Sequence, residues 1–184
     1  MELVVHTPTT APDGARQVLE GIAAELGFIP NLAGAAAGSP ALATGFDALR
    51  RAATATGLDP VDREIAGLAV GVHVHNSYGV AFHSTRLDRL GAAEQEIEAM
   101  RAGSAPSDSR QAAVYEFARE VAVRRGEVGD KAVAALREAG FDDRGVLDIL
   151  TECAFATLVG LIDNLAGRVP LDDFLRPRTW TAGA

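Results

Sequence analysis

Three of the four histidines in this 184-residue chain lie close together, beside a tyrosine and downstream of a glutamate. The glutamate is Glu64, the tyrosine is Tyr78, and the histidines are His73, His75 and His83. Histidine titrates near neutral pH, and burial can raise the pKa of a carboxylate toward the same range. Side chains of these types are therefore suited to proton transfer.

The spacing in residues 64–83 predicts which of these side chains meet. If the chain is helical from Glu64 onward, a step of eleven residues at about 100° per residue places His75 on the face of Glu64. We expect a pocket lined by Glu64, His75, Tyr78 and His83. In it, Glu64 would orient a histidine or accept its proton, and Tyr78 would hydrogen-bond an oxyanion or a carboxylate.

Two other interpretations of the same residues stay open. Buried polar side chains must find partners in any protein, so a purely structural network fits them too. His73, His75 and His83 are also ligand types for zinc, iron or nickel. On a helix, however, His73 and His75 point about 200° apart, whereas helical metal motifs space histidines four apart. We predict no bound metal and no other cofactor.

Composition excludes several classes of protein. The net charge is -8, with 25 acidic and 17 basic residues, which repels a phosphate backbone, so we expect no nucleic-acid partner. Cys153 is the only cysteine, which excludes an internal disulfide, a CxxC pair and a cysteine zinc site. No apolar run reaches about 18 residues and no signal sequence opens the chain, so we expect a cytoplasmic protein without a membrane partner.

Apolar residues recur at spacings of three and four between glycines and prolines, which predicts an all-α fold. We expect helices over residues 18–26, from residue 40 to about 56, from residue 60 into the histidine segment, and over 111–125, 130–139 and 142–165. Asp59 and Pro60 are typical of an N-cap and a first helical position. Residues 76–79 indicate a break or kink, residues 92–97 a short turn, and residues 103–109 a loop.

Length favours one domain over residues 1–184, with a core over about 18–170 and an extended C-terminal tail over about 170–184. The tail contains Phe174, Leu175 and Trp180, large apolar side chains that a solvated terminus does not need. We expect the tail to pack against the body of the protein or against a neighbouring subunit.

Three blocks of this sequence resemble the carboxymuconolactone decarboxylase and alkylhydroperoxidase AhpD-like family, most closely its peroxidase-related branch. The blocks are residues 26–42, with Pro30-Asn31 and Ser39-Pro40, then residues 62–91, and then the segment from Glu152 to Asn164. The resemblance implies an AhpD-like antiparallel helical bundle. It also implies a homo-oligomer, either a trimer or a hexamer.

In the redox members of that family a glutamate is followed twelve positions later by Cys-x-x-Cys, and a histidine lies four positions after the second cysteine. Here Glu64 and His83 occupy the ends of that frame, whereas Asn76 and Gly79 stand at the cysteine positions. Peroxide reduction of this type needs a thiolate and a second thiol. We therefore expect no thiol chemistry at this site, space for a ligand or water beside Gly79, and Cys153 as a small core residue.

The decarboxylase members also lack the cysteine pair and are thought to use acid-base groups in the same pocket on a small carboxylated lactone. Because His83 keeps the family's histidine position, it is the expected acid or base. The resemblance thus favours an acid-base enzyme acting on a small organic acid or lactone. The alternatives are a non-catalytic ligand-binding or structural protein on this scaffold, and a peroxidase-related protein with a non-thiol mechanism.

Overall fold

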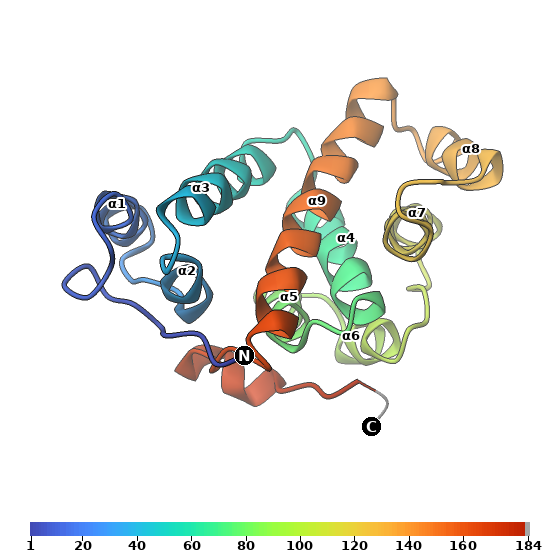
Figure 1. The fold of residues 1–184 in the computed structure, drawn as a ribbon. Coiled ribbons are helices and arrows are strands. Elements are labelled where there is room, and N and C mark those ends of the chain that lie inside the picture. The colour runs from blue at the N-terminus through green and yellow to red at the C-terminus, as the bar shows by residue number, and fades with distance from the viewer. Residues whose placement is uncertain (183–184) are drawn as a thin grey trace.

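Helices account for all the regular structure in residues 1–182, the part of the chain that this computed structural model describes (Figure 1). The elements are α1 (Arg16–Leu26), α2 (Asn31–Ala36), α3 (Pro40–Thr54), α4 (Pro60–His73), α5 (Ser77–Arg89), α6 (Glu94–Arg101), α7 (Ser109–Arg124), α8 (Asp130–Glu138), α9 (Asp143–Leu165) and a short 3-10 helix, η1 (Asp173–Arg178). The predicted all-α class is confirmed.

Capping side chains fix the starts of the two helices that matter most for the site. Asp59 accepts a hydrogen bond from the amide of Val61 at 2.8 Å, and Pro60 takes the first position of α4, as the sequence predicts. Asn76 accepts a hydrogen bond from the amide of Gly79 at 2.9 Å and so begins α5. The caps set where each helix starts, and therefore which residues face inward.

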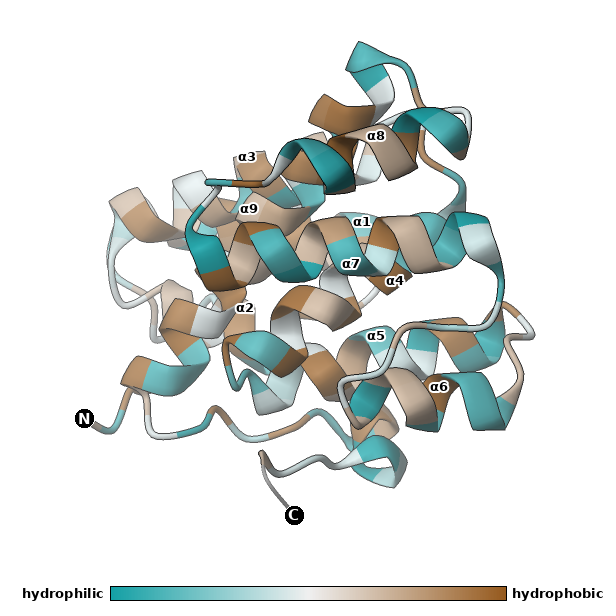
Figure 2. Cartoon of the chain, turned by 90° about the vertical axis from the view of Figure 1, so that its right-hand side faces the viewer, coloured by the Kyte–Doolittle hydropathy of each residue, from teal (hydrophilic) through white to brown (hydrophobic). Residues whose placement is uncertain are grey.

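Helix α4 lies at the centre of the molecule and packs against α5, α7 and α9 (Figure 1). One hydrophobic cluster joins α4 to α7 and α8, and a second joins α1, α2 and α3. Both α5 and α9 contribute side chains to the two clusters, so they hold the halves together. In Figure 2, polar and apolar residues alternate along α6 and α8, the pattern of outer helices with one solvated side.

The structure differs from the sequence expectation in three places. Helix α2 lies where no helix was predicted, and α6 replaces a predicted short turn, because Ile97 and Met100 are buried against the core. The predicted break in the histidine segment is confirmed, but it lies at residues 74–76 rather than 76–79, since α4 ends at His73 and α5 begins at Ser77.

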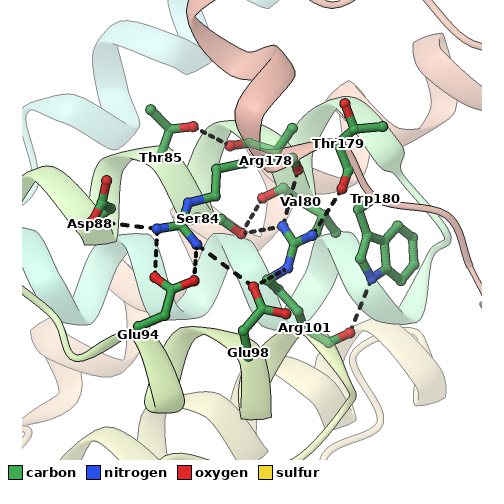
Figure 3. A network of polar contacts seen from close by, with 11 residues as sticks. Val80, Ser84, Thr85, Asp88, Glu94, Glu98, Arg101, Arg178, Thr179 and Trp180 are labelled. Atoms are coloured by element: carbon green, nitrogen blue, oxygen red, sulfur yellow. Dashed lines mark hydrogen bonds and ion pairs between the residues drawn. The ribbon is translucent and has the colours of Figure 1, made fainter.

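The C-terminal tail folds back onto α5 and α6 and contains η1, so it is less extended than expected (Figure 3). Arg178 binds both carboxylate oxygens of Glu94 at 2.6 Å, and Trp180 donates its indole hydrogen to the carbonyl of Arg101 at 3.1 Å. Leu175 is fully buried. Packing of the tail against the body, as predicted, is confirmed by these contacts.

Helix α9 is long and apolar enough to cross a membrane on length and composition alone. It packs against α3, α4, α5 and α7, and it buries Glu152, Cys153 and Asp163 among them. Core helices of water-soluble proteins pass the same test of length and hydropathy. The contacts of α9 are those of a core helix.

Candidate functional site

A cavity of about 390 Å³ lies between α3, α4, α5 and α9, with η1 along one side. Much of its wall is aromatic, including Phe46, Phe82 and Phe155. Phe28 and Phe174 stack edge to face at a centroid distance of 5.5 Å and also line it. An apolar cavity of this size with a few polar groups is typical of a small-molecule site.

Glu64 and His83 form a buried pair in the wall of the cavity. Nδ1 of His83 lies 2.8 Å from Oε2 of Glu64, and both side chains are about 95% buried. The ring fits because α4 has glycine at position 67: a Cβ there would lie 2.1 Å from Cε1 of His83. Helices α4 and α5 therefore approach closely enough at this point for the side chains of Glu64 and His83 to meet.

Glu152 of α9 approaches the same histidine from the opposite side. Its Oε1 lies 3.9 Å from Nε2 of His83, too far for a direct hydrogen bond but close enough for the two groups to attract each other when both are charged. Burial raises the pKa of Glu152 to about 7, against a smaller lowering by His83. Near neutral pH this carboxyl group therefore exists in both its protonated and its ionised form.

Glu64 behaves in the opposite way. Burial acts to raise its pKa, but the hydrogen bond and charge of His83 and the neighbouring Arg63 outweigh burial, and the net pKa is lowered. Glu64 is thus a carboxylate at neutral pH and accepts the hydrogen of His83 Nδ1. In the neutral ring, Nε2 then carries the lone pair and faces Glu152.

Arginines give one wall of the cavity positive charge. Arg63 and Arg86 lie 3.1 and 3.6 Å from Oε1 of Glu64. Arg50 forms ion pairs with Glu25 and Asp47. Arg89 lies over the ring of Phe174 and forms no ion pair within residues 1–182. Positive charge beside an apolar cavity favours a ligand with an anionic group.

Tyr78 lines the cavity, but its hydroxyl is already used. It donates a hydrogen bond to Oδ2 of Asp172, whose carboxylate also accepts from the backbone amide of Asn31 at 3.3 Å. Burial, together with the hydrogen bond and charge of Asp172, raises the pKa of Tyr78 above its ordinary value. Tyr78 therefore ties the tail to the cavity wall, and the expected hydrogen bond from its hydroxyl to a ligand is not supported by this geometry.

Asn76 and Gly79 stand at the two positions that carry cysteine in redox relatives, and they pack closely against each other. A Cβ at Gly79 would lie 2.2 Å from Nδ2 of Asn76, whose side chain is fully buried. The space expected beside Gly79 is thus partly taken by Asn76, although Gly79 itself lines the cavity. Cys153 is buried, and burial raises the pKa of its thiol, so the predicted core role is confirmed.

The other two histidines of the segment lie elsewhere. His75 is exposed in the connection between α4 and α5, with φ of 55°, and it does not line the cavity. Its predicted place beside Glu64 is wrong, because the helix ends before it. His73 binds the carbonyl of Ala69 at 2.8 Å. The three histidines do not converge, and no group of three potential ligands among residues 1–182 has metal-site geometry.

Sequence reasoning missed Glu152 and Asp172 as part of this site. Both lie far along the chain from the histidine segment, and their approach depends on how α9 and the tail pack. Glu152 did carry a signal, since it is a lone acidic residue in the apolar stretch 149–162. A carboxylate in such a stretch is rarely buried without a partner.

Comparisons with known proteins agree with this fold. Residues 40–124 match the model of the carboxymuconolactone decarboxylase family, and no curated protein matches the sequence. An uncharacterised peroxidase-related protein with an alkylhydroperoxidase AhpD core, from Ralstonia eutropha JMP134, is 27% identical with a TM-score of 0.78, covering 94% of this chain and 93% of that chain.

Two further solved structures show the same fold at lower identity. An uncharacterised peroxidase-related protein from Silicibacter sp. TM1040 is 22% identical with a TM-score of 0.75, covering 95% of this chain and 93% of that one. A cysteine-to-alanine variant of the debrominase Bmp8, in complex with 2,3,4-tribromopyrrole, is 16% identical with a TM-score of 0.73, covering 97% of this chain and 96% of that one. This chain therefore has the AhpD-like fold of these peroxidase-related proteins, and residues 40–124 match the carboxymuconolactone decarboxylase family.

Proposed function

We propose that this protein is an acid-base enzyme that moves a proton on a small organic acid or lactone. The observation that carries the proposal is the buried line of Glu64, His83 and Glu152 in the wall of a cavity of about 390 Å³. Two carboxyl groups with pKa values moved in opposite directions flank one imidazole. Such divergence is typical of paired acid and base roles.

In the proposed reaction, Nε2 of His83 removes a proton from a substrate carbon next to a carbonyl group. The electron pair of that C–H bond moves onto the carbonyl oxygen as an enolate, and Glu64 stabilises the imidazolium that forms. The imidazolium returns the proton at another carbon, which restores neutral His83 and completes an isomerisation. In a decarboxylation, the C–C bond to the leaving carboxylate breaks and carbon dioxide departs, its electron pair forms the enolate, and protonated Glu152 gives the enolate a proton that water then replaces.

The arginines supply the reason for an acidic substrate. Arg63 and Arg86 lie beside the carboxylate of Glu64, and Arg89 adds a further positive charge near Phe174. A carboxylate on the substrate would meet these groups while its apolar body contacts the phenylalanine rings. An enolate gains from the same positive charge, so the arrangement favours the transition state as well as binding.

A non-catalytic ligand-binding protein is the second candidate, and the long separation of His83 and Glu152 favours it. At 3.9 Å no proton passes directly between them, so the line works only when a substrate brings donors and acceptors of its own. Thiol-dependent peroxide reduction lacks support, because Cys153 is buried and outside the cavity.

One experiment distinguishes the acid-base enzyme from the non-catalytic binding protein. A panel of small unsaturated acids, keto acids and lactones is incubated with the protein in D₂O, and proton NMR follows exchange of carbon-bound hydrogen. His83→Asn is expected to slow exchange by about 10² to 10⁴-fold. His75→Asn is the matched control, because His75 is exposed and outside the cavity, and it retains the wild-type rate.

Either of two results contradicts the enzyme proposal. Ligands that bind, as seen by chemical-shift changes, without any exchange indicate a binding protein. Exchange that survives in His83→Asn places the chemistry on other groups.

A further inference from the structure

Arg89 differs from the other arginines in the cavity wall because no carboxylate of residues 1–182 holds it. The others each lie within ion-pair distance of a carboxylate, and they are Arg50, Arg63 and Arg86. The guanidinium of Arg89 lies over the ring of Phe174 instead, with Cζ 5.2 Å from the ring centroid. A cation over an aromatic face is attracted to it without using its N–H donors. Arg89 can therefore offer those donors to a carboxylate on a ligand.

The ring beneath Arg89 is fixed by the chain on both sides of it. Two residues before Phe174, the carboxylate of Asp172 accepts the hydrogen bond of Tyr78, and the residue after it, Leu175, is fully buried. The ring itself meets Phe28 edge to face at a centroid distance of 5.5 Å. The folded tail thus gives Arg89 a fixed platform at the edge of the cavity.

The charges give the cavity an inner and an outer end. Glu64, His83 and Glu152 are only 3–5% exposed, whereas Arg89 is exposed and lies six residues beyond His83 on α5, about 9 Å along the helix axis. At the inner end an acid group on a ligand would meet the carboxyl groups of Glu64 and Glu152. Glu25, which also lines the outer end, is compensated by ion pairs with two arginines at 2.8 and 2.9 Å. The arrangement therefore favours a ligand whose carboxylate lies at the outer end.

The wall of the cavity is aromatic. Five of the seven phenylalanines of the chain line it: Phe28, Phe46, Phe82, Phe155 and Phe174. The rings of Phe46 and Phe155 lie 5.4 Å apart between centroids, and the ring of Phe82 meets that of His83 edge to face at 5.3 Å. Aromatic rings attract one another in such offset and edge-to-face arrangements. This wall therefore favours a flat ring over a saturated body of the same size.

We propose that the substrate is an aromatic monocarboxylic acid, whose ring lies among the phenylalanines and whose carboxylate binds Arg89 at the outer end of the cavity. Phe174 is the positioning residue that holds Arg89 in place. The inference rests on the proposed function for the identity of the site, and it adds the class of substrate. The reacting carbonyl group then lies on the side of the ring opposite the carboxylate, toward His83. A carboxylate held at the outer end stays on the product, which favours isomerisation over loss of carbon dioxide.

Isothermal titration calorimetry with three probes tests this inference. The first, para-acetylbenzoate, has the carboxylate, the ring and a carbonyl group, para-acetylbenzamide lacks the charge, and the cyclohexane analogue of para-acetylbenzoate lacks the aromatic ring. The wild type is expected to bind the acid about 10-fold or more tightly than the amide, because a hydrogen bond to an ionised group is stronger. It is expected to bind the acid about 2- to 10-fold more tightly than the cyclohexane analogue.

Two variants assign the preference to residues. Arg89→Gln is expected to bring the affinities for the acid and the amide to within about 2-fold of each other. Arg176→Gln is the matched control and retains the preference, because Arg176 lies on η1 with a 70% exposed side chain and does not line the cavity. Phe174→Leu is expected to lower the preference by about 2- to 5-fold, since the cation loses its ring. A purely structural role of Phe174 would weaken both ligands equally and leave the ratio unchanged.

Three results overturn the inference: an acid preference that survives in Arg89→Gln, a cyclohexane analogue that binds as tightly as the aromatic acid, or no binding of any probe. Exchange of the acetyl hydrogens of para-acetylbenzoate in D₂O, followed by proton NMR on the same samples, reports on the proposed function separately. Binding with the expected preferences but without exchange supports the ligand class and contradicts the enzyme. Exchange with an acid preference that Arg89→Gln leaves intact supports the enzyme and overturns the role of Arg89.

Discussion

Replacing Glu152 with glutamine keeps the size of the side chain and removes its titrating proton. The folded protein holds the pKa of Glu152 at about 7, mainly because burial penalises the carboxylate. In the unfolded chain the same group titrates near its ordinary value of 4.5. The glutamine variant cannot ionise, so it lacks the cost of burying this charge.

The sign and size of the effect follow from these two values. Between pH 4.5 and 7 the folded state holds one more proton on Glu152 than the unfolded state, so the free energy of unfolding falls as pH rises. At about 1.4 kcal/mol per pH unit, the loss reaches about 3 kcal/mol and becomes constant above pH 7. Between pH 4.5 and pH 8, the free energy of unfolding of the wild type is therefore expected to fall by about 3 kcal/mol more than that of Glu152→Gln.

Guanidinium unfolding followed by circular dichroism at several pH values measures this difference. Glu20→Gln provides the control, because Glu20 is exposed on α1 and forms no ion pair within residues 1–182. Its pH profile is expected to run parallel to that of the wild type. Parallel profiles for Glu152→Gln and the wild type would refute the assignment of a raised pKa to this residue.

Three further outcomes are expected. Gly67→Ala forces the ring of His83 away and costs about 1–3 kcal/mol of unfolding free energy in the same assay, with loss of any exchange activity. Tyr78→Phe leaves Asp172 without its hydroxyl donor and costs about 1–3 kcal/mol, which a lowered melting temperature detects. Cys153 is expected to react with a thiol-specific reagent only after denaturation, because it is buried and its pKa is raised; rapid labelling of the native protein contradicts this.

Much of the fold could be predicted from local signals in the sequence. Asp59 and Pro60 specify the start of α4, and the long helix over 142–165 is visible from its apolar spacing. Helices α2 and α6 could not be predicted in the same way, because they are only six and eight residues long. Short helices depend on tertiary burial more than on their own propensity.

The site could be predicted only in part. The resemblance to the redox members of the family predicts that Glu64 and His83 share a site. In the structure, Nδ1 of His83 lies 2.8 Å from Oε2 of Glu64. The prediction for His75 was wrong because the helix does not continue that far. His75 itself has left-handed backbone geometry between α4 and α5, so helical spacing no longer relates it to Glu64. Glu152 could not be assigned to the site from sequence, because its distance to His83 depends on the packing of α9 across α5.

The packing of Asn76 against Gly79 limits how this protein could acquire a dithiol at these two positions. A cysteine introduced first at position 79 would place its Cβ 2.2 Å from Asn76 Nδ2, and Gly160 packs close on the other side of that side chain. A cysteine introduced first at position 76 removes the obstruction, at the expense of the cap that begins α5. Mutational routes to a dithiol here are therefore ordered, with residue 76 changing before residue 79.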